Sequence, residues 1–155
     1  MMGTIVKRTP RQWDVFFMGL AQLTAKMSKD PDRKVGAVVV SADRRQLSIG
    51  YNGLPACVPD DLDVLTDRAR KLELMVHAEE NCIRQAPFGL AGSTLYVTRF
   101  PCEHCATKIV TAGITRLVAP RPDFNHGRWG PSWHEANRHL YLHGVTVIAL
   151  GTLRD

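Results

Sequence analysis

The last third of the chain alternates short β-branched, apolar runs with amphipathic segments of helical length. Strands are predicted at 93–99, 114–120 and 145–150, and helices between them at 102–113 and 132–143. Gly113 stands where the first of these helices should end, because glycine adopts the left-handed conformation that closes helices. A strand–helix–strand–helix–strand order favours parallel strands joined by right-handed crossovers.

The first half of the chain has a different pattern. It predicts an amphipathic helix at 11–29, two strands at 35–41 and 47–52, a loop at 53–61, and helix over 62–86 in two pieces that break near His77. Asp30-Pro31 should end the first helix, and the short polar turn SADRR favours an antiparallel pair of strands. Together the two halves predict a three-layer α/β/α fold, in which a five-stranded mixed sheet has helices on both faces.

Length and composition indicate a globular chain. Its 155 residues suit one domain spanning residues 1–155, with 45% hydrophobic and 23% charged residues. No apolar run approaches the roughly 20 residues of a membrane helix, and no apolar signal core follows the basic N-terminus, so we expect a cytoplasmic protein. The net charge of +5 is compatible with a phosphorylated partner or with a simple solvated surface.

The segment PCEHC places Cys102 and Cys105 at the start of a predicted helix. Four cysteines are too few and too unevenly spaced for a disulfide framework. A redox pair often occupies such a strand–helix junction, whereas a structural zinc site needs four protein ligands, often from a second CxxC motif, which the chain lacks. A catalytic zinc ion needs three protein ligands and an open fourth position.

The segment HAE supplies the missing parts of a catalytic site. His77 is predicted to begin a helix and offers the third zinc ligand, and the amides at both helix N-termini favour the thiolate form of the cysteines. Glu79 points away from His77 and is free to move a proton from a zinc-activated water to a leaving amine. An H-x-E motif followed by P-C-x-x-C is the known signature of zinc nucleobase deaminases.

Beyond these motifs, the chain resembles the zinc-dependent cytidine and deoxycytidylate deaminase superfamily, and most of all its deoxycytidylate (dCMP) deaminase branch. The resemblance extends over most of the chain and rests on five segments: DPDRKVGAVVV (30–40), IGYNGLPACVPDD (49–61), VHAEEN (76–81), TLYVTRFPCEHCA (94–106) and AGITRLV (112–118). GYNG followed by a paired-aspartate loop and then HAExN is more specific than the zinc motif, which many deaminases share.

The resemblance implies hydrolysis of dCMP to dUMP with release of ammonia. It implies one catalytic zinc ion held by His77, Cys102 and Cys105, with Glu79 as the proton shuttle. Asn52 matches a residue that holds the sugar or phosphate, and the backbone of Ala78 is expected to contact the base. Family members form homo-oligomers, either hexamers or dimers, and respond to dCTP and dTTP, so Mg²⁺ would accompany a nucleotide effector.

The chain also departs from the family pattern. Asp32 stands where some members carry a phosphate-binding arginine, so Arg33 and Lys34 become the candidates for that contact. The segment 121–133 is longer than expected and places Phe124 where a tyrosine is common, so Phe124 is a candidate for lining the pocket. Trp129 and Trp133 in this region, with Arg128, form either a base-stacking wall or, as we favour, packing onto the core.

Two other functions remain compatible with the motifs. One is deamination of another or a modified base, free or within nucleic acid, although the absence of a basic tail makes nucleic acid the less expected partner. The other is a non-catalytic zinc module, which an intact Glu79 disfavours.

Outside the motifs, His104 is expected to be exposed, Cys82 to be a buried thiol, Cys57 to be exposed or lightly buried, and His139 and His143 to form a pair on a helix surface.

Overall fold

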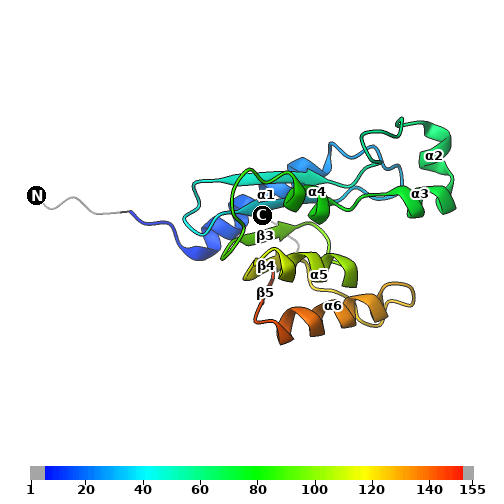
Figure 1. Cartoon of the computed structure of the whole chain (residues 1–155). Helices are drawn as coiled ribbons and strands as arrows, with labels where there is room; N and C mark the ends of the chain where they lie inside the picture. Colours follow the sequence, from blue (N-terminus) through cyan, green and yellow to red (C-terminus); the bar gives the residue numbers. More distant parts are fainter. Residues whose placement is uncertain (1–5, 152–155) are drawn as a thin grey trace, which may run out of the picture.

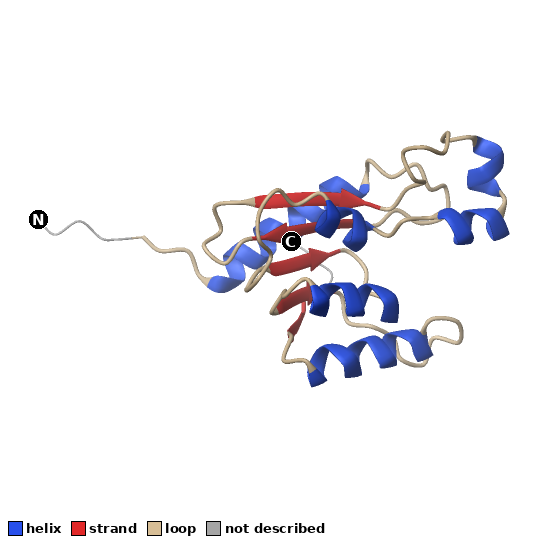
Figure 2. Ribbon diagram, viewed as in Figure 1, coloured by secondary structure: helices blue, strands red, loops and turns tan. Residues whose placement is uncertain are grey.

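The computed structural model describes residues 6–151 as helices and loops around one five-stranded sheet of order β2-β1-β3-β4-β5 (Figures 1 and 2). The strands are β1 (Gly36–Val40), β2 (Leu47–Tyr51), β3 (Thr94–Val97), β4 (Arg116–Ala119) and β5 (Thr146–Ala149). The helices are α1 (Pro10–Ala25), α2 (Leu62–Thr66), α3 (Arg68–Leu74), α4 (Ala78–Arg84), α5 (Glu103–Thr111) and α6 (Gly130–Leu142). The two ends of the predicted domain, 1–5 and 152–155, lie outside the described residues.

The sheet combines the two patterns read from the sequence. β1 is antiparallel to both β2 and β3, whereas β3, β4 and β5 run parallel. The β-α-β-α-β order of the second half therefore produces parallel strands, with α5 and α6 as the crossovers. The predicted fold class, a mixed five-stranded sheet between helices, is confirmed.

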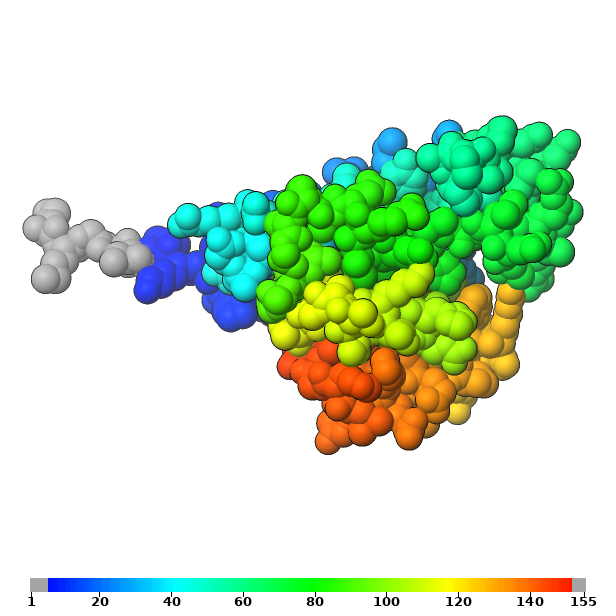
Figure 3. Space-filling model, in the orientation of Figure 1, coloured from blue at the N-terminus to red at the C-terminus, as the bar shows by residue number. Residues whose placement is uncertain are grey.

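The helices form two unequal layers. α1 packs on one face of the sheet, and α4, α5 and α6 pack on the other, while α2 and α3 lie beyond one end (Figure 1). β1 is buried along its whole length, with Val38 directed toward α1 and Val39 toward α4. A strand covered on both faces reads as a continuous apolar run, which explains the sequence GAVVV. In the space-filling view, atoms of α4, α5 and α6 cover much of the near face (Figure 3).

Glycines let two of these helices lie directly on the sheet. A Cβ on Gly50 would lie 2.4 Å from the backbone nitrogen of Cys82 and 2.5 Å from the carbonyl oxygen of Ala78, so any side chain there would push α4 away. Gly36 has the same role on the other face, where its Cβ would lie 2.1 Å from the carbonyl oxygen of Ala21 in α1. The first glycine of the GYNG segment thus sets the distance of α4 from β2.

A buried polar network ties α1 to the sheet. Asp14 accepts two hydrogen bonds from the guanidinium of Arg116, at 2.8 and 2.7 Å, and one from the hydroxyl of Tyr96 at 2.9 Å. Burial by itself would raise the pKa of Asp14, but the hydrogen bonds from Arg116 and Tyr96 outweigh it and lower that pKa. The carboxylate is therefore held in its charged form.

Two helix predictions need correction. The first helix ends at Ala25 and not near residue 29, because the following turns direct Ser28 inward, where its hydroxyl donates to the carbonyl of Asn52 at 2.8 Å. The segment 62–86 contains three helices and not two. The break near His77 is confirmed, and Asp67 adds another because its side chain accepts from two amides of α3 and so starts a new helix.

No helix in residues 6–151 has the length and apolar content needed to cross a membrane.

Candidate active site

The two sequence motifs meet because α4 and α5 begin side by side at one end of the sheet. His77 is the N-cap of α4 and Cys102 the N-cap of α5, and neither side chain caps its own helix. Both side chains are therefore free to point into the space between the helix ends. Cys105 follows in the first turn of α5, on the same side. Paired backbone hydrogen bonds between Gly53 and Val76 hold the chain that leads into His77.

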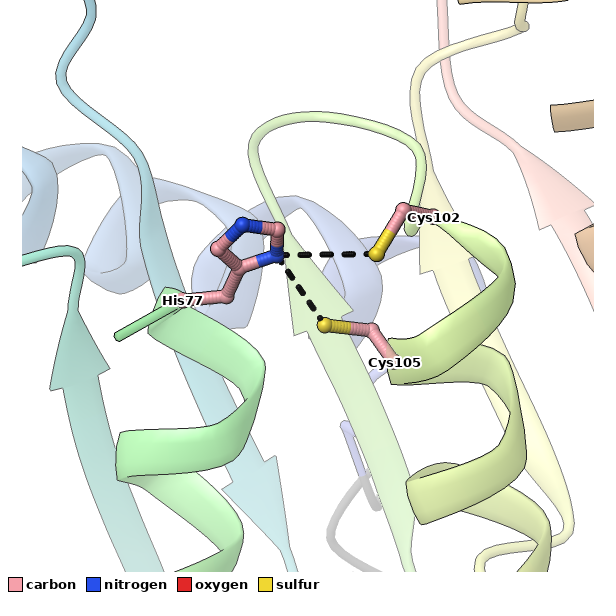
Figure 4. A group of neighbouring side chains, drawn as sticks. All are labelled: His77, Cys102 and Cys105. Atoms are coloured by element: carbon pink, nitrogen blue, oxygen red, sulfur yellow. Dashed lines mark hydrogen bonds between the residues drawn. The ribbon is translucent and has the colours of Figure 1, made fainter. Parts of the chain in front are cut away.

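The three candidate ligands point at one another (Figure 4). Nδ1 of His77 lies 3.3 Å from Sγ of Cys105 and 3.6 Å from Sγ of Cys102, and all three ligand atoms lie within 4.8 Å of one another. A tetrahedral zinc ion, with Zn–S near 2.3 Å and Zn–N near 2.0 Å, separates a nitrogen and a sulfur ligand by about 3.5 Å. The observed spacing therefore fits zinc, with Nδ1 as the histidine ligand.

The charge of the cluster also suits a cation. A hydrogen bond from Cys105 lowers the pKa of Cys102 to about 3, and the same contact, together with burial, raises the pKa of Cys105. The hydrogen bond with Cys102 raises the pKa of His77. The pKa of one thiol is thus lowered and that of the other is raised, and a cation bound between the two sulfurs would favour the thiolate form of both.

Glu79 occupies the second position of α4, next to the cluster but outside the ligand set. It is only 4% exposed, and burial raises the pKa of its carboxyl group, although the charge of His77 opposes the shift. Ala78, its neighbour at the first helical position, is 1% exposed and lines the same cavity. A buried carboxyl group with a raised pKa is suited to accepting and returning a proton.

Several contacts fix the relative positions of the helices that carry the site. An ion pair between Glu80 and Lys108 joins α4 to α5. The backbone amide of Glu103 donates to Oγ of Ser132 at 3.2 Å, which joins the N-terminus of α5 to α6. These contacts hold the ligands in a preformed arrangement.

Two residues of the cluster, His77 and Cys102, line a cavity of about 490 Å³, within the range of small-molecule sites. The cavity is lined by Asp32, Arg33, Val35, Asn52, Arg68, Lys71, Leu72, Met75, His77, Ala78, Glu79, Arg99, Phe100, Cys102, Arg128, Trp129 and Trp133. Five of these residues are basic and two are acidic, so the cavity favours an anionic ligand.

Asn52 organises the loop that forms one wall. Its amide oxygen accepts from the backbone of Val35 at 2.8 Å, and its amide nitrogen donates to the carbonyl of Arg33 at 2.9 Å. Lys71 is buried beneath the same loop, where it pairs with Asp30 and Asp32. Asn52 therefore positions Arg33, and whether Asn52 also contacts a ligand stays a prediction.

The other predicted substrate contacts divide into two groups. Arg33 and Ala78 line the cavity, as Asn52 does, whereas Lys34 and Phe124 are exposed and are not among the lining residues. The ring of Phe124 packs against His134 on α6 instead. The contacts proposed for Lys34 and Phe124 would thus require a ligand that extends beyond this cavity.

Sequence analysis left two roles open for Trp129 and Trp133, a wall of the binding site or packing onto the core. Trp133 is 8% exposed and belongs to the core, and its indole nitrogen donates to the carbonyl of Phe100 at 3.1 Å. Trp129 packs against that core, and both rings line the cavity. Packing and pocket lining are therefore not exclusive here.

Sequence reasoning missed Arg99, Arg68 and Lys71, which all line the cavity. The only signal for Arg99 is its position between a buried strand and the FPC segment, which is too general to identify a binding residue. Arg68 and Lys71 lie on a helix whose placement depends on the loops around it.

The predictions for His104, Cys82 and Cys57 are confirmed. The side chain of His104 is 86% exposed, Cys82 is fully buried and Cys57 is exposed. His139 on α6 and His143 directly after it do pair, with ring centroids 4.3 Å apart. The surface position expected for the pair is wrong for His139, which is half-buried and has a buried Nε2 atom.

Comparison with known proteins agrees with this geometry. Residues 11–120 match the model of the cytidine and deoxycytidylate deaminase zinc-binding region. The match includes both motifs and all three candidate ligands.

Individual relatives show the same family. An uncharacterized deaminase of Aliivibrio fischeri is 40% identical over 90% of this chain and 94% of its own length. The deoxycytidylate deaminase of Mycobacterium phage D29 is 40% identical over 70% of this chain and 94% of its own length. The human deoxycytidylate deaminase is 37% identical over 69% of this chain, and the match spans 64% of the human protein.

A solved structure supports the fold. The dCMP deaminase of cyanophage S-TIM5 superposes with a TM-score of 0.71 over 92% of this chain and all of its own, at 24% identity. At that identity the likeness concerns the fold alone. The sequence match and the His–Cys–Cys cluster decide the family, and the chain belongs to the zinc-binding cytidine and deoxycytidylate deaminases.

Proposed function

We propose that this chain hydrolyses a cytosine nucleotide, dCMP in particular, to dUMP and ammonia. The observation that carries the proposal is the convergence of His77, Cys102 and Cys105 next to the buried Glu79, in a cavity lined by basic residues. Relatives named as deoxycytidylate deaminases, at 37–40% identity, support the choice of dCMP.

The roles of the residues follow from their positions. His77, Cys102 and Cys105 would hold one zinc ion, which would supply an open coordination position and lower the pKa of a water molecule there to about 7. Glu79 accepts one proton of the attacking water and delivers it to the ring nitrogen, and it then moves the second proton of that water from the new hydroxyl group to the departing amine. Burial keeps the Glu79 carboxyl group away from bulk water, so the proton stays within the site.

Substrate contacts come from the cavity walls. The backbone of Ala78 contacts the base, and Asn52 and Arg33 hold the sugar and phosphate side of the nucleotide. Lys34 and Phe124 act only on parts of a ligand that extend beyond the cavity. The whole of residues 1–155 acts as one catalytic domain.

We also propose a homo-oligomer, a hexamer or a dimer, that responds to dCTP and dTTP, with Mg²⁺ accompanying the effector. Exposed apolar side chains support self-association: Leu47, Ile49 and Tyr51 on the edge strand β2 are 39–48% exposed. A cytoplasmic location fits thiolate ligands, which need reducing conditions.

The test is ammonia release by zinc-loaded protein from dCMP, CMP, dCTP, deoxycytidine, 5-methyl-dCMP and dAMP, each with and without dCTP and magnesium. Turnover dominated by dCMP supports the proposal, and dependence on dCTP would show effector control. Turnover of another compound alone would keep the zinc chemistry and change the substrate. If no compound releases ammonia, the proposed activity is wrong.

A further inference from the structure

Arg99 follows β3 and lines the cavity together with Glu79 and Cys102, yet within residues 6–151 its guanidinium forms no salt bridge. The Nη2 atom is buried and has no hydrogen-bond partner within residues 6–151. A buried guanidinium nitrogen without an acceptor is costly, because water no longer solvates it. Such a group in a cavity indicates that a ligand supplies the acceptor.

Two tryptophans hold Arg99 in place without using its N–H groups. Its guanidinium carbon lies 4.6 Å from the ring centre of Trp129 and 5.4 Å from that of Trp133. The two rings stack on each other at 6.4 Å and 24°. Stacking uses the flat face of the guanidinium and leaves the in-plane N–H donors free. The arginine is therefore oriented before any ligand arrives.

The charges around Arg99 are unbalanced in favour of an anion. Four arginines line the cavity, and in the described part of the chain none of them forms a salt bridge: Arg33, Arg68, Arg99 and Arg128. The only lining carboxylates are Asp32, which pairs with Lys71, and Glu79 beside the metal cluster.

Arg33 is close enough to Arg99 to affect it. Burial and, after it, repulsion by Arg33 lower the pKa of Arg99. Two cations that repel each other in a partly buried cavity store unfavourable energy, which a doubly charged anion between them would relieve.

We propose that Arg99, together with Arg33, binds the 5′-monophosphate of the nucleotide, and that Arg99 sets the preference for a monophosphate over a nucleoside. This inference rests on the proposed function for the identity of the nucleotide. The planar fork of Arg99 matches two phosphate oxygens, whereas a lysine would act as a point charge. Trp129 and Trp133 act as positioning residues, because they touch the arginine that binds the phosphate.

The test compares binding of dUMP and deoxyuridine by isothermal titration calorimetry to four zinc-loaded proteins: wild type, Arg99→Gln, Arg99→Lys and the matched control Arg138→Gln. Arg138 is an exposed arginine on α6 outside the cavity. We expect Arg99→Gln to weaken dUMP binding about 10- to 100-fold, the usual effect of a lost charged hydrogen bond, and to leave deoxyuridine binding unchanged. Arg99→Lys should fall between wild type and Arg99→Gln, and Arg138→Gln should match wild type.

Kinetics give a second readout. With dCMP, Arg99→Gln should raise KM and leave kcat near the wild-type value, because the lost contact is to a group remote from the reacting amine. Equal weakening of dUMP and deoxyuridine would overturn the proposal, since Arg99 would then act on the base or the pocket shape. No change in either would show that Arg99 does not touch the nucleotide.

Failure of this inference is distinguishable from failure of the proposed function. Absence of ammonia release from the wild type would reject the activity, while the dUMP and deoxyuridine titrations would still report on the phosphate contact. If wild type binds dUMP no better than deoxyuridine, the phosphate contact is rejected whatever the activity. Should Arg99→Gln fail to fold, as judged by thermal unfolding and zinc content, Arg33→Gln and Arg99→Lys provide the same selectivity comparison.

Discussion

Arg116 and Arg99 are both partly buried arginines, but they differ in what surrounds them. Arg116, on the α1 side of the sheet, donates from both terminal nitrogens of its guanidinium to Asp14, which also accepts from the hydroxyl of Tyr96. Arg99, in the cavity on the opposite side, rests on tryptophan rings and has a buried nitrogen without a partner. The hydrogen bonds of Arg116 stay within the protein and stabilise the fold, whereas the buried nitrogen of Arg99 still has a donor that a ligand can use.

The same contrast extends to the two faces of the sheet (Figure 1). On the α1 side, the buried carboxylate of Asp14 is paired with Arg116 within the protein. The other side collects two thiols, a histidine and several cations around a cavity, and these groups need a metal ion and an anion to balance them. Changes on the cavity side should therefore alter chemistry, and changes on the α1 side should alter stability.

The largest effect is expected from Cys102→Ala. Removing one of three protein ligands should abolish stoichiometric zinc binding and with it all turnover, because two ligands rarely retain zinc against buffer. Zinc content measured by mass spectrometry on purified protein, alongside ammonia release, checks this. Cys57→Ala is the matched control, since Cys57 is exposed and should leave both values unchanged. Full zinc content in Cys102→Ala would remove this cysteine from the ligand set.

Glu79→Gln should lower kcat by about 10²- to 10⁴-fold, the usual contribution of a positioned general acid–base. Zinc content should stay at the wild-type value, because Glu79 is not a ligand in the cluster. The exposed Glu73 on α3 provides the control Glu73→Gln, with unchanged kcat. Wild-type turnover by Glu79→Gln would exclude the proton-transfer role.

The variant Asp14→Asn tests the α1 side of the sheet, where the effect should be on stability. Breaking a buried ion pair by removing one partner costs roughly 3 kcal/mol of unfolding free energy, which urea unfolding measures. Turnover of the folded variant should stay within about twofold of wild type, because Asp14 lies on the far side of the sheet from the cavity. As a control, Glu135→Gln removes an exposed ion pair with Arg138 and should cost less than about 0.5 kcal/mol. If Asp14→Asn lost activity without losing stability, the assignment of stability to the α1 side and of chemistry to the cavity side would be wrong.

The stability effect of Asp14 should depend on pH. The pKa of Asp14 is held below the ordinary value of an aspartate in the folded protein, because the hydrogen bonds from Arg116 and Tyr96 outweigh the effect of burial. Its contribution is therefore fully present above the unfolded-state pKa and is lost as the pH falls through the folded-state pKa. The difference in unfolding free energy between wild type and Asp14→Asn should be constant near neutral pH and narrow below about pH 4. Comparing the two proteins cancels zinc loss at low pH, and a gap that widens in acid would contradict the assignment.

The smallest expected effects are changes in KM, and they distinguish the neighbouring residues Arg33 and Lys34. Arg33→Gln should raise KM for dCMP about tenfold, as expected for one lost charged contact, and Lys34→Gln should change KM less than twofold. Arg33 lines the cavity and Lys34 does not. Steady-state kinetics at two salt concentrations measure both. If Lys34→Gln has the larger effect, the nucleotide binds farther out than the cavity indicates.

The candidate metal ligands could be predicted from the sequence alone. His77, Cys102 and Cys105 each lie at or near a helix N-terminus, and the chain order of strand, turn and helix brings such ends to one edge of a sheet. Local sequence patterns also predicted the position of Glu79 in a helix, the helix-ending role of Gly113 after α5, and the parallel strands of the second half. These features depend on spacing within short segments, which a sequence displays directly.

The rest of the cavity depends on contacts between distant segments and became visible only in the folded chain. Three contacts join segments more than 15 residues apart: β1 pairs with β3, Asn52 holds the loop carrying Arg33, and Arg99 packs on Trp129. The same is true of the early end of α1, where Ser28 bonds to Asn52 across 24 residues. Such contacts arise from packing between elements, and no periodicity or short motif in the chain encodes which distant side chains will meet.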